Sequence, residues 1–362
     1  VEKLKKSYRF VDLIFGTHNI YKFAELLTNS MQSDRMVIDI WKDTDQIVED
    51  LPSDRKFSFK CGVNIMYGCN NFCSYCIVPY VRGREQSRKK EEILAEVEAL
   101  AKQGISEVML LGQNVNSYGN IYEYKDGKIV EVDEKDRVTF PQLLTEVCKI
   151  DGIKRVRFMT SHPKDLSDEL IEVMAEEPKI CKHLHLPVQC GSDELLKKMN
   201  RHYTVEQYLE LIEYARKTVP GITFSSDIIV GFPGETEADF VKTLELVQKV
   251  GYMQLFTFIY SKRTGTKAAE MPDPTPRKEK TDRMTRLLAT QDEIAMALVK
   301  AQVGQTVRVL VEGFGRNEGT LSGRLDNNLT VEFAADPALM GSYAQVHLTG
   351  ARATVLLGEL ET

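Results

Sequence analysis

A repeated alternation of short apolar strands and amphipathic helices is the feature that most limits how this chain can fold. It begins near Phe59, ends near Lys300, and predicts six strands that are each followed by helix. The predicted strands are Cys61–Met66, Val108–Leu111, Val156–Met159, His183–Leu186, Thr223–Val230 and Gln254–Tyr260. Six such units in about 235 residues favour α/β architecture with parallel strands and right-handed crossovers. The alternation alone fits both an open sheet and a barrel.

The helices of this alternation are marked by apolar residues that recur on one helical face. In the first, Ile93, Val97 and Leu100 fall on the same side. The predicted helices are Lys89–Gln103, Gln142–Ile150, Asp168–Glu176, Asp193–Met199, Val205–Thr218, Glu237–Val250 and Arg277–Lys300.

A shorter pattern precedes the alternation. Residues 1–50 read as the end of an α/β unit, with strands predicted at Val11–Gly16 and Val37–Ile40 and a helix at Ile20–Met31. The polar stretch Glu49–Phe57 contains a proline and is expected to be a linker. We therefore expect the main barrel to occupy residues 58–300.

The pattern changes again at the C-terminal end. Short alternating segments separated by glycine and asparagine turns predict a small all-β barrel over 301–362. The predicted strands are Val307–Val311, Gly319–Leu325, Leu329–Phe333, Tyr343–Leu348 and Ala353–Leu357. A barrel of this size belongs to the class of small oligonucleotide-binding modules.

The composition is that of an ordinary globular protein. Of 362 residues, 43% are hydrophobic and 28% charged, and the net charge is −6. No apolar run approaches the roughly 18–20 residues that cross a bilayer, so no membrane partner is expected. Seven cysteines in a chain of this length do not indicate a disulfide framework. This favours a reducing compartment such as the cytoplasm.

Three cysteines, Cys69, Cys73 and Cys76, lie within eight residues. A structural zinc site would need a fourth ligand nearby. A 4Fe-4S cluster held by three cysteines leaves one iron open to another ligand. The C-x3-C-x2-C spacing therefore favours an iron–sulfur cluster over a structural metal or unrelated thiols. Together with the strand–helix alternation, it favours a partial (β/α)6 barrel, similar to a TIM barrel.

This cysteine spacing resembles that of radical S-adenosylmethionine (SAM) enzymes. The resemblance implies that the amino and carboxylate groups of SAM occupy the open iron. It also implies that an electron from the cluster cleaves the sulfonium and yields a 5′-deoxyadenosyl radical. In such barrels, the active site lies at the C-terminal ends of the strands.

Polar and glycine-containing segments follow the predicted strands at that end. The residues expected to bind SAM are Tyr75, Gly112, Gln113, Asn114, Ser161, Gln189, Gly231 and Glu235. Amide side chains can bond the amino-acid part of SAM or a base edge, and glycine permits close approach of the backbone to an adenine. The alternative for each is ordinary turn or loop chemistry.

Basic side chains follow the cysteine loop and are candidates for contacts with RNA phosphates. These are Arg82, Arg84 and Arg88, and the C-terminal module adds Phe314 and Arg316. The alternative is a solvated charged face.

The remaining cysteines and the paired histidines have simpler interpretations. Buried thiols are expected at Cys61, Cys148, Cys181 and Cys190. His183 and His185 share one face of a strand, and we expect them to pack or form hydrogen bonds rather than bind metal.

Longer segments resemble the radical-SAM methylthiotransferases, and specifically their tRNA branch, the 2-methylthio-N6-dimethylallyladenosine synthases. The segments that carry the resemblance are Tyr67–Gly83, Leu111–Tyr118, Thr160–Pro163, His185–Gln189, Gly231–Thr236 and Phe258–Ser261. It extends from about Asp12 to the end, where the last module resembles the RNA-binding TRAM domain.

The resemblance implies that the three cysteines ligate the radical-generating cluster. The expected reaction adds a methylthio group to C2 of N6-dimethylallyladenosine beside the tRNA anticodon, and the catalytic residues remain unknown. One SAM would donate the methyl group and another the radical. The expected partners are tRNA, SAM and an electron donor such as flavodoxin or ferredoxin, and the chain is expected to be a monomer.

One departure from that family affects the expected activity. The family holds a second cluster, which carries the sulfur, on three cysteines of an N-terminal domain, and no such triad precedes Cys61. Residues 1–50 are therefore expected to be the remnant of that domain, and this chain to bind one cluster without completing sulfur insertion. Two substrates remain as alternatives, threonylcarbamoyl-adenosine in tRNA and an aspartate of a ribosomal protein. An alternative of another class is a non-catalytic, metal-stabilised RNA-binding protein.

Overall fold

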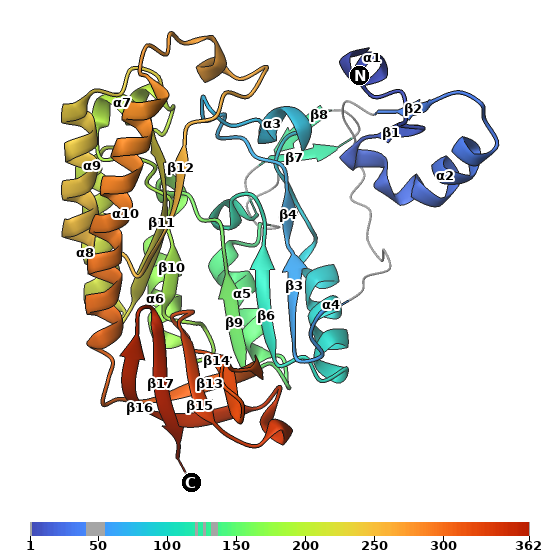
Figure 1. Ribbon diagram of the computed structural model, residues 1–362. Helices are drawn as coiled ribbons and strands as arrows, with labels where there is room; N and C mark the ends of the chain where they lie inside the picture. Colours follow the sequence, from blue (N-terminus) through green and yellow to red (C-terminus); the bar gives the residue numbers. More distant parts are fainter. Residues whose placement is uncertain (1, 41–54, 120–121, 126–127, 132–136, 362) are drawn as a thin grey trace.

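The computed structural model describes residues 2–40, 55–119, 122–125, 128–131 and 137–361 (Figure 1). Most of the predicted linker, and the last part of the predicted 1–50 unit, lie outside the described residues.

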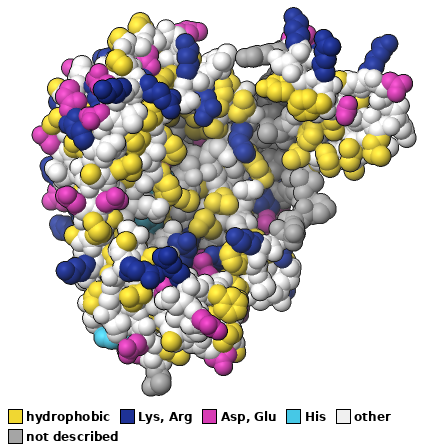
Figure 2. Space-filling model, viewed as in Figure 1, with side chains coloured by type: hydrophobic (Ala, Val, Ile, Leu, Met, Phe, Trp, Pro, Cys, Tyr) yellow, Lys and Arg dark blue, Asp and Glu magenta, His cyan; other side chains and the backbone are white. Residues whose placement is uncertain are grey.

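The N-terminal unit, residues 2–40, is a small α/β arrangement. Strands β1 (Leu13–Phe15) and β2 (Val37–Asp39) pair in parallel, and helix α2 (Phe23–Met31) connects them. The two predicted strands and the helix are confirmed, with shorter bounds. Two further helices are α1 (Glu2–Ser7) and the 3-10 helix η1 (Thr17–Lys22). Hydrophobic side chains gather on the surface of this unit (Figure 2), where Phe10 is 79% and Met31 81% exposed.

Six parallel strands form two three-stranded sheets, in the orders β3-β6-β9 and β10-β11-β12. Their bounds are β3 Lys60–Asn64, β6 Glu107–Leu111, β9 Arg155–Phe158, β10 His183–His185, β11 Thr223–Val230 and β12 Gln254–Ile259. A parallel bridge between Val156 and Ile180 brings the two sheets together. No strand pairing among the described residues joins β12 back to β3. All six predicted strands are therefore present, and the barrel is partial, as predicted.

The helices cover the outside of this partial barrel (Figure 1). Their bounds are α4 Lys90–Lys102, α5 Phe140–Lys149, α6 Asp168–Glu176, α7 Asp193–Lys198, α8 Val205–Thr218, α9 Glu237–Val250 and α10 Arg277–Lys300. The predicted apolar face of α4 is confirmed, because Ile93, Val97 and Leu100 are buried in the core. Among the described residues, no helix is both long and apolar enough to cross a membrane.

Several short elements were not predicted. Two-residue strands β4 (Met66–Tyr67) and β5 (Gln86–Ser87) pair antiparallel and tie together the ends of the segment that carries the three cysteines. The one-turn helix α3 (Val78–Val81) lies within that segment. A hairpin of β7 (Tyr122–Lys125) and β8 (Lys128–Glu131) follows β6. Two-residue strands are too short for a sequence pattern to reveal.

The C-terminal barrel is closed, in the order β13-β14-β15-β17-β16. Its strands are β13 Thr306–Phe314, β14 Thr320–Arg324, β15 Thr330–Ala334, β16 Tyr343–Arg352 and β17 Val355–Leu360. Alternate side chains such as Val309, Val311 and Leu321 fill its core, because successive strand residues point to opposite faces. The five predicted strands and the small all-β barrel are confirmed.

The C-terminal barrel packs at the end of the partial barrel where its strands begin (Figure 1). Two buried arginines of β9 make this contact. Arg155 donates to the carbonyl oxygens of Arg324 (3.1 Å) and Arg308 (3.2 Å), and Arg157 donates to those of Leu325 and Asp326 (both 2.7 Å). The opposite end of the strands is left for the polar segments that follow them.

Candidate functional site

The three predicted cluster ligands lie on one loop after β4, at the C-terminal end of the barrel strands. Backbone hydrogen bonds hold this loop from several sides. Its first cysteine, Cys69, donates its N–H to the carbonyl of Gly83 (3.3 Å). Ser74 donates to Met199 (3.0 Å) and accepts from Ala268 (2.8 Å). Segments far apart in the sequence thus fix the backbone of the loop that carries the three thiols.

The start of the loop requires a glycine. Gly68 has φ +71°, in the left-handed region, and a Cβ added there would lie 2.0 Å from the carbonyl oxygen of Arg84. No larger residue fits this close approach without moving the backbone. Phe72, between the first two cysteines, also has positive φ (46°). The loop is therefore a constrained turn.

The three thiols, of which Cys73 is buried and Cys69 and Cys76 are half-buried, lie close enough to affect one another's charge. Burial, with a smaller contribution from the neighbouring Cys73 and Cys76, raises the pKa of Cys69 to about 12. Burial likewise raises the pKa of Cys76. Three thiolates in one buried place repel each other unless a cation lies between them. A cationic cluster is therefore the kind of group that fits this donor set.

The three thiols do not form a site for a single metal ion. Within the part of the chain that the structure describes, no three His, Cys, Asp or Glu side chains form a ready metal-binding group. The ligands of a 4Fe-4S cluster each bind a different iron, so three thiols spaced along one loop suit a cluster better than a single ion.

The side chain of Arg201 contacts the cysteine loop at Cys73 and Tyr75. Its guanidinium is buried and donates to the Cys73 sulfur (3.4 Å), the Tyr203 hydroxyl (2.8 Å) and the Pro187 carbonyl (2.6 Å). It also lies 3.5 Å from the hydroxyl oxygen of Tyr75. A fixed positive charge at this position stabilises negative charge on the cysteine loop.

Several predicted SAM ligands present buried polar atoms that have no hydrogen-bond partner among the described residues. These atoms are Gln113 Oε1, Asn114 Oδ1 and Ser161 Oγ, and His162 Nε2 behaves in the same way. The amide nitrogen of Asn114, in contrast, donates to Asp165 (2.7 Å). Burying a polar atom without a hydrogen bond is costly, so such atoms usually mark a missing partner. Their position after β6 and β9 fits a polar cofactor at the mouth of the barrel.

Other predicted SAM ligands have structural contacts of their own. The Glu235 carboxylate accepts from the Gly231 backbone (2.7 Å) and from Arg283 (2.8 Å), and burial raises its pKa. A Cβ at Gly112 would lie 2.4 Å from the side chain of Met66. The Glu235 carboxylate thus holds the loop that begins at Gly231, and close packing against Met66 accounts for the glycine at 112. SAM binding by Gly112, Gly231 and Glu235 stays a prediction.

The predicted ligand Gln189 follows β10 and forms an isolated parallel bridge with Ile228 of β11. It has φ +77°, and its N–H donates to the carbonyl oxygen of Asp227 (2.9 Å). The positive φ of Gln189 changes the direction of the backbone after β10. Tyr75 also faces this region through its contact with Arg201. SAM binding by Gln189 and Tyr75 stays a prediction.

Comparisons with known proteins identify the family. A model of the radical SAM superfamily matches residues 63–247, and a TRAM domain model matches residues 300–360. The tRNA-2-methylthio-N6-dimethylallyladenosine synthase of Lachnoclostridium phytofermentans is 53% identical over 361 residues, which cover 99% of this chain and 76% of that protein. The chain belongs to the tRNA-2-methylthio-N6-dimethylallyladenosine synthase family.

Further synthases of this family agree. That of Clostridioides difficile is 51% identical and that of Thermoanaerobacter sp. strain X514 is 50% identical, each over 99% of this chain and 73% and 74% of the respective relative. A superposition on the solved structure of coproporphyrinogen III oxidase (HemN) from Escherichia coli covers 68% of this chain and 54% of the HemN chain. The sequence identity is 16% and the TM-score is 0.45. Membership of the radical SAM superfamily implies a 4Fe-4S cluster and SAM as cofactors.

The side chains predicted to contact RNA differ in their exposure to solvent. Arg82 and Arg84 are exposed beside the cysteine loop, and Phe314 and Arg316 are exposed on the C-terminal barrel. Arg88 does not fit the prediction, because it is 7% exposed and donates to the Asn64 carbonyl (2.6 Å) and to Glu96. Basic and acidic side chains are interspersed on the face shown in Figure 2. RNA binding would therefore depend on individual arginines.

The interpretation of the other cysteines and histidines is largely confirmed. Cys148, Cys181 and Cys190 are buried, whereas Cys61 is only half-buried because its strand β3 lies at the edge of a sheet. The ring of His183 bonds Thr223 (2.8 Å), as expected for a hydrogen-bonding role.

Two residues of this synthase's barrel were missed by sequence reasoning. Arg201 lies in a polar turn after α7, and its local sequence gives no sign that the turn meets the cysteine loop. Asp227 gives a usable signal, because it is a charged residue inside the otherwise uncharged strand Thr223–Val230.

Proposed function

We propose that this chain carries the radical-generating and RNA-binding parts of a methylthiotransferase that modifies C2 of N6-dimethylallyladenosine in tRNA. One observation carries the proposal. A loop with three cysteines is fixed at the mouth of a partial barrel in a chain about 50% identical to synthases of that name over almost its whole length. C2–H of adenine resists ordinary nucleophilic chemistry, which makes a radical a suitable reagent.

The proposed cluster ligands are Cys69, Cys73 and Cys76. Bound there, the cluster supplies the electron that cleaves SAM. Arg201 stabilises the negative charge of the cysteine loop, and the unpartnered polar atoms after β6 and β9 would bind the polar groups of SAM. The sequence holds one cysteine triad with this spacing, so we propose that these 362 residues bind one cluster. The second cluster expected from the resemblance has no matching triad among them.

Partners and boundaries complete the proposal. We propose tRNA as the macromolecular substrate, a small redox protein such as flavodoxin or ferredoxin as electron donor, and a monomer as the working form. A reducing compartment such as the cytoplasm suits the free thiols. The divisions at 1–50, 58–300 and 301–362 are proposed as domain bounds, since the pattern of elements changes near them.

Anaerobic reconstitution with iron and sulfide tests the cofactor part. The chain should load about four irons and, with a strong reductant, release 5′-deoxyadenosine from SAM. One tightly bound zinc and no SAM cleavage would instead support a non-catalytic, metal-stabilised RNA-binding protein.

The substrate is tested in cells. Deletion of the gene should remove 2-methylthio-N6-dimethylallyladenosine from digested tRNA, with accumulation of N6-dimethylallyladenosine measured by mass spectrometry. Loss of a threonylcarbamoyl nucleoside, or of a modified ribosomal-protein aspartate, would identify one of the alternative substrates.

A further inference from the structure

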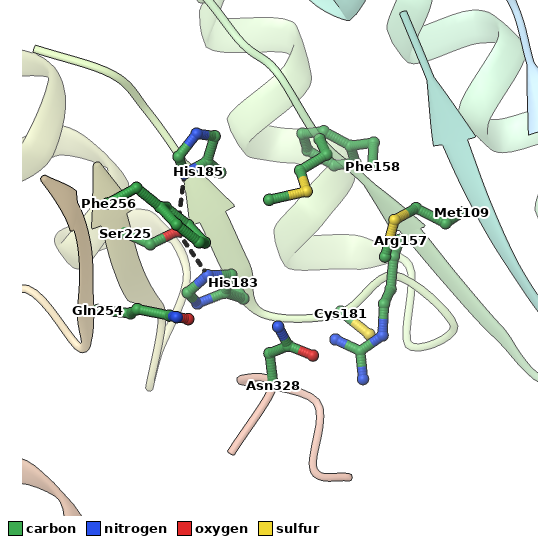
Figure 3. A pocket seen from close by; sticks show the side chains of 11 residues that line it. Met109, Arg157, Phe158, Cys181, His183, His185, Ser225, Gln254, Phe256 and Asn328 are labelled. Carbon is green, nitrogen blue, oxygen red and sulfur yellow. Dashed lines mark hydrogen bonds between the residues drawn. The ribbon is translucent and has the colours of Figure 1, made fainter. Parts of the chain in front are cut away.

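One wall of the barrel interior is formed by alternate residues of the sheet β10-β11-β12. His183, Ser225, Gln254 and Phe256 line a small cavity of about 30 Å³ at its base (Figure 3). Residues two apart on a strand share a face, so His185, Asp227 and Phe258 continue the same wall toward the cysteine loop. These seven residues form the interior wall.

A hydrogen-bonded chain fixes the histidines of the interior wall. The Ser225 hydroxyl lies 2.9 Å from His183 Nε2 and 3.0 Å from His185 Nδ1, as the dashed lines of Figure 3 show. Burial lowers the pKa of His183 to about 3 and that of His185 to about 4, so both rings are neutral at pH 7. The other ring nitrogen of His185, Nε2, lies 3.5 Å from Asp227 Oδ1. The Asp227 carboxylate therefore lies beside a fixed, neutral His185 ring, without a hydrogen bond to it.

Asp227 has capacity to accept hydrogen bonds from a ligand. Its side chain is 29% exposed, and among the hydrogen bonds between described residues none ends on its carboxylate oxygens. Burial raises its pKa to about 6, and the positive charge of Arg201 opposes this rise. The group is therefore mainly ionised at pH 7.5, and an ionised carboxylate is an acceptor only.

Aromatic side chains flank this carboxylate. Phe258 is 52% exposed although it belongs to the interior wall, and Phe256 packs edge-on against the His185 ring at 5.5 Å. Met109 and Met159 also line the small cavity at the base of this wall. Aromatic and apolar faces beside one hydrogen-bonding group are the usual means by which proteins hold an unstacked base.

We propose that Asp227, which lies beside His185, accepts a hydrogen bond from the exocyclic N6–H of the target adenosine, while Phe256 and Phe258 pack against the base and its N6 substituent. The ring nitrogens of adenosine accept hydrogen bonds, so its N6–H is the one nitrogen donor that a carboxylate can bind. N6-alkylation leaves one such hydrogen. This inference rests on the proposed function and assigns its base-reading residues.

Two synthetic anticodon stem-loop RNAs test the inference. One carries N6-dimethylallyladenosine, and the other carries the same base with N6–H replaced by N6-methyl. Dissociation constants are measured anaerobically by fluorescence anisotropy for the reconstituted wild-type chain and for Asp227→Ala and Asp227→Asn. Asp292→Asn, on the exposed side of α10, is the matched control.

The wild-type chain and the Asp292→Asn control should bind the N6–H RNA about tenfold more tightly than the N6-methyl RNA, as expected for a hydrogen bond to a charged group. Asp227→Ala should bind both RNAs equally, and Asp227→Asn should lie between. A tenfold preference that persists in Asp227→Ala overturns the inference. So does a loss of SAM affinity in that variant without a change in RNA binding, because Asp227 would then belong to the SAM site.

Phe258→Ala provides an independent test if the Asp227 variants do not fold. Its ring is half-exposed, so its removal leaves the core intact. It should weaken binding of both RNAs about tenfold and keep the preference for N6–H. Unchanged affinity for both overturns the packing role. If the wild-type chain binds neither RNA, the proposed function fails, whereas binding without any Asp227-dependent preference removes only this inference.

Discussion

The contact between the two barrels should depend strongly on Arg157, which we would replace with methionine. The Arg157 guanidinium is 6% exposed and donates to the carbonyls of Leu325 and Asp326, both at 2.7 Å. It also lies 3.2 Å from the buried Glu107 carboxylate. Methionine has a similar length, so the change removes charge and donors without leaving a large cavity.

The expected cost follows from these contacts. Hydrogen bonds that involve a charged group contribute about 1.5–3 kcal/mol each, and removing one partner of a buried ion pair costs about 3–5 kcal/mol. Glu107 keeps Arg155 at 3.3 Å, and the variant no longer buries a guanidinium. The remaining Arg155 contact and the absence of a buried charge both reduce the expected loss of stability. We expect Arg157→Met to lower the free energy of unfolding by about 3 kcal/mol.

Anaerobic urea unfolding, followed by circular dichroism, measures this loss. Lys149→Met is the control, because its ion pair with Glu146 is exposed and should contribute less than about 0.5 kcal/mol. Hydrogen exchange should also show earlier opening of the C-terminal barrel in Arg157→Met. A loss no larger than that of the control would refute the reasoning, since the two barrels would then be held by other contacts.

Three more predictions concern the site. Alanine at Cys69, Cys73 or Cys76 should reduce iron loading from about four per chain to near zero in a colorimetric iron assay, and retention of four irons would contradict the cluster assignment. Gly68→Ala should lose about 2 kcal/mol or more in urea unfolding, because its Cβ would overlap the Arg84 carbonyl, and a neutral result would argue against the loop geometry. Folding raises the Asp227 pKa from 3.8 to about 6, so the folded state holds more protons between these values and stability falls as pH rises through them. Asp227→Asn should therefore be more stable than wild type by up to about 3 kcal/mol at pH 7.5 and equal to it near pH 4, and a pH-independent difference would exclude this cause.

Local patterns in the sequence predicted most of the elements. Helix α8, Val205–Thr218, has the predicted bounds, because Thr204 and Gln207 form a capping box at its start and Pro220 follows its end. The loop with three cysteines was predicted from spacing alone. These features depend on neighbours in the chain, so a single sequence is enough to find them.

Contacts between distant segments were not predictable in the same way. Arg88 follows the cysteine loop directly and looked like an RNA contact, yet the pairing of β4 with β5 turns it inward onto Asn64. Arg201 meets Cys73 across 128 residues of chain. A periodicity of hydrophobic residues says which face is buried, but it does not say which segment covers that face.

The sequence by itself therefore determined the strand–helix alternation, the small C-terminal barrel and the three thiols that suit a cluster. Only the tertiary structure decided that the C-terminal barrel packs where the strands begin, and that Asp227 lies beside His185 on the interior wall. The physical reason is that periodicity and spacing are set by residues close in the chain. The packing of sheets, and the partners of buried charges, depend on segments that meet only when the whole chain has folded.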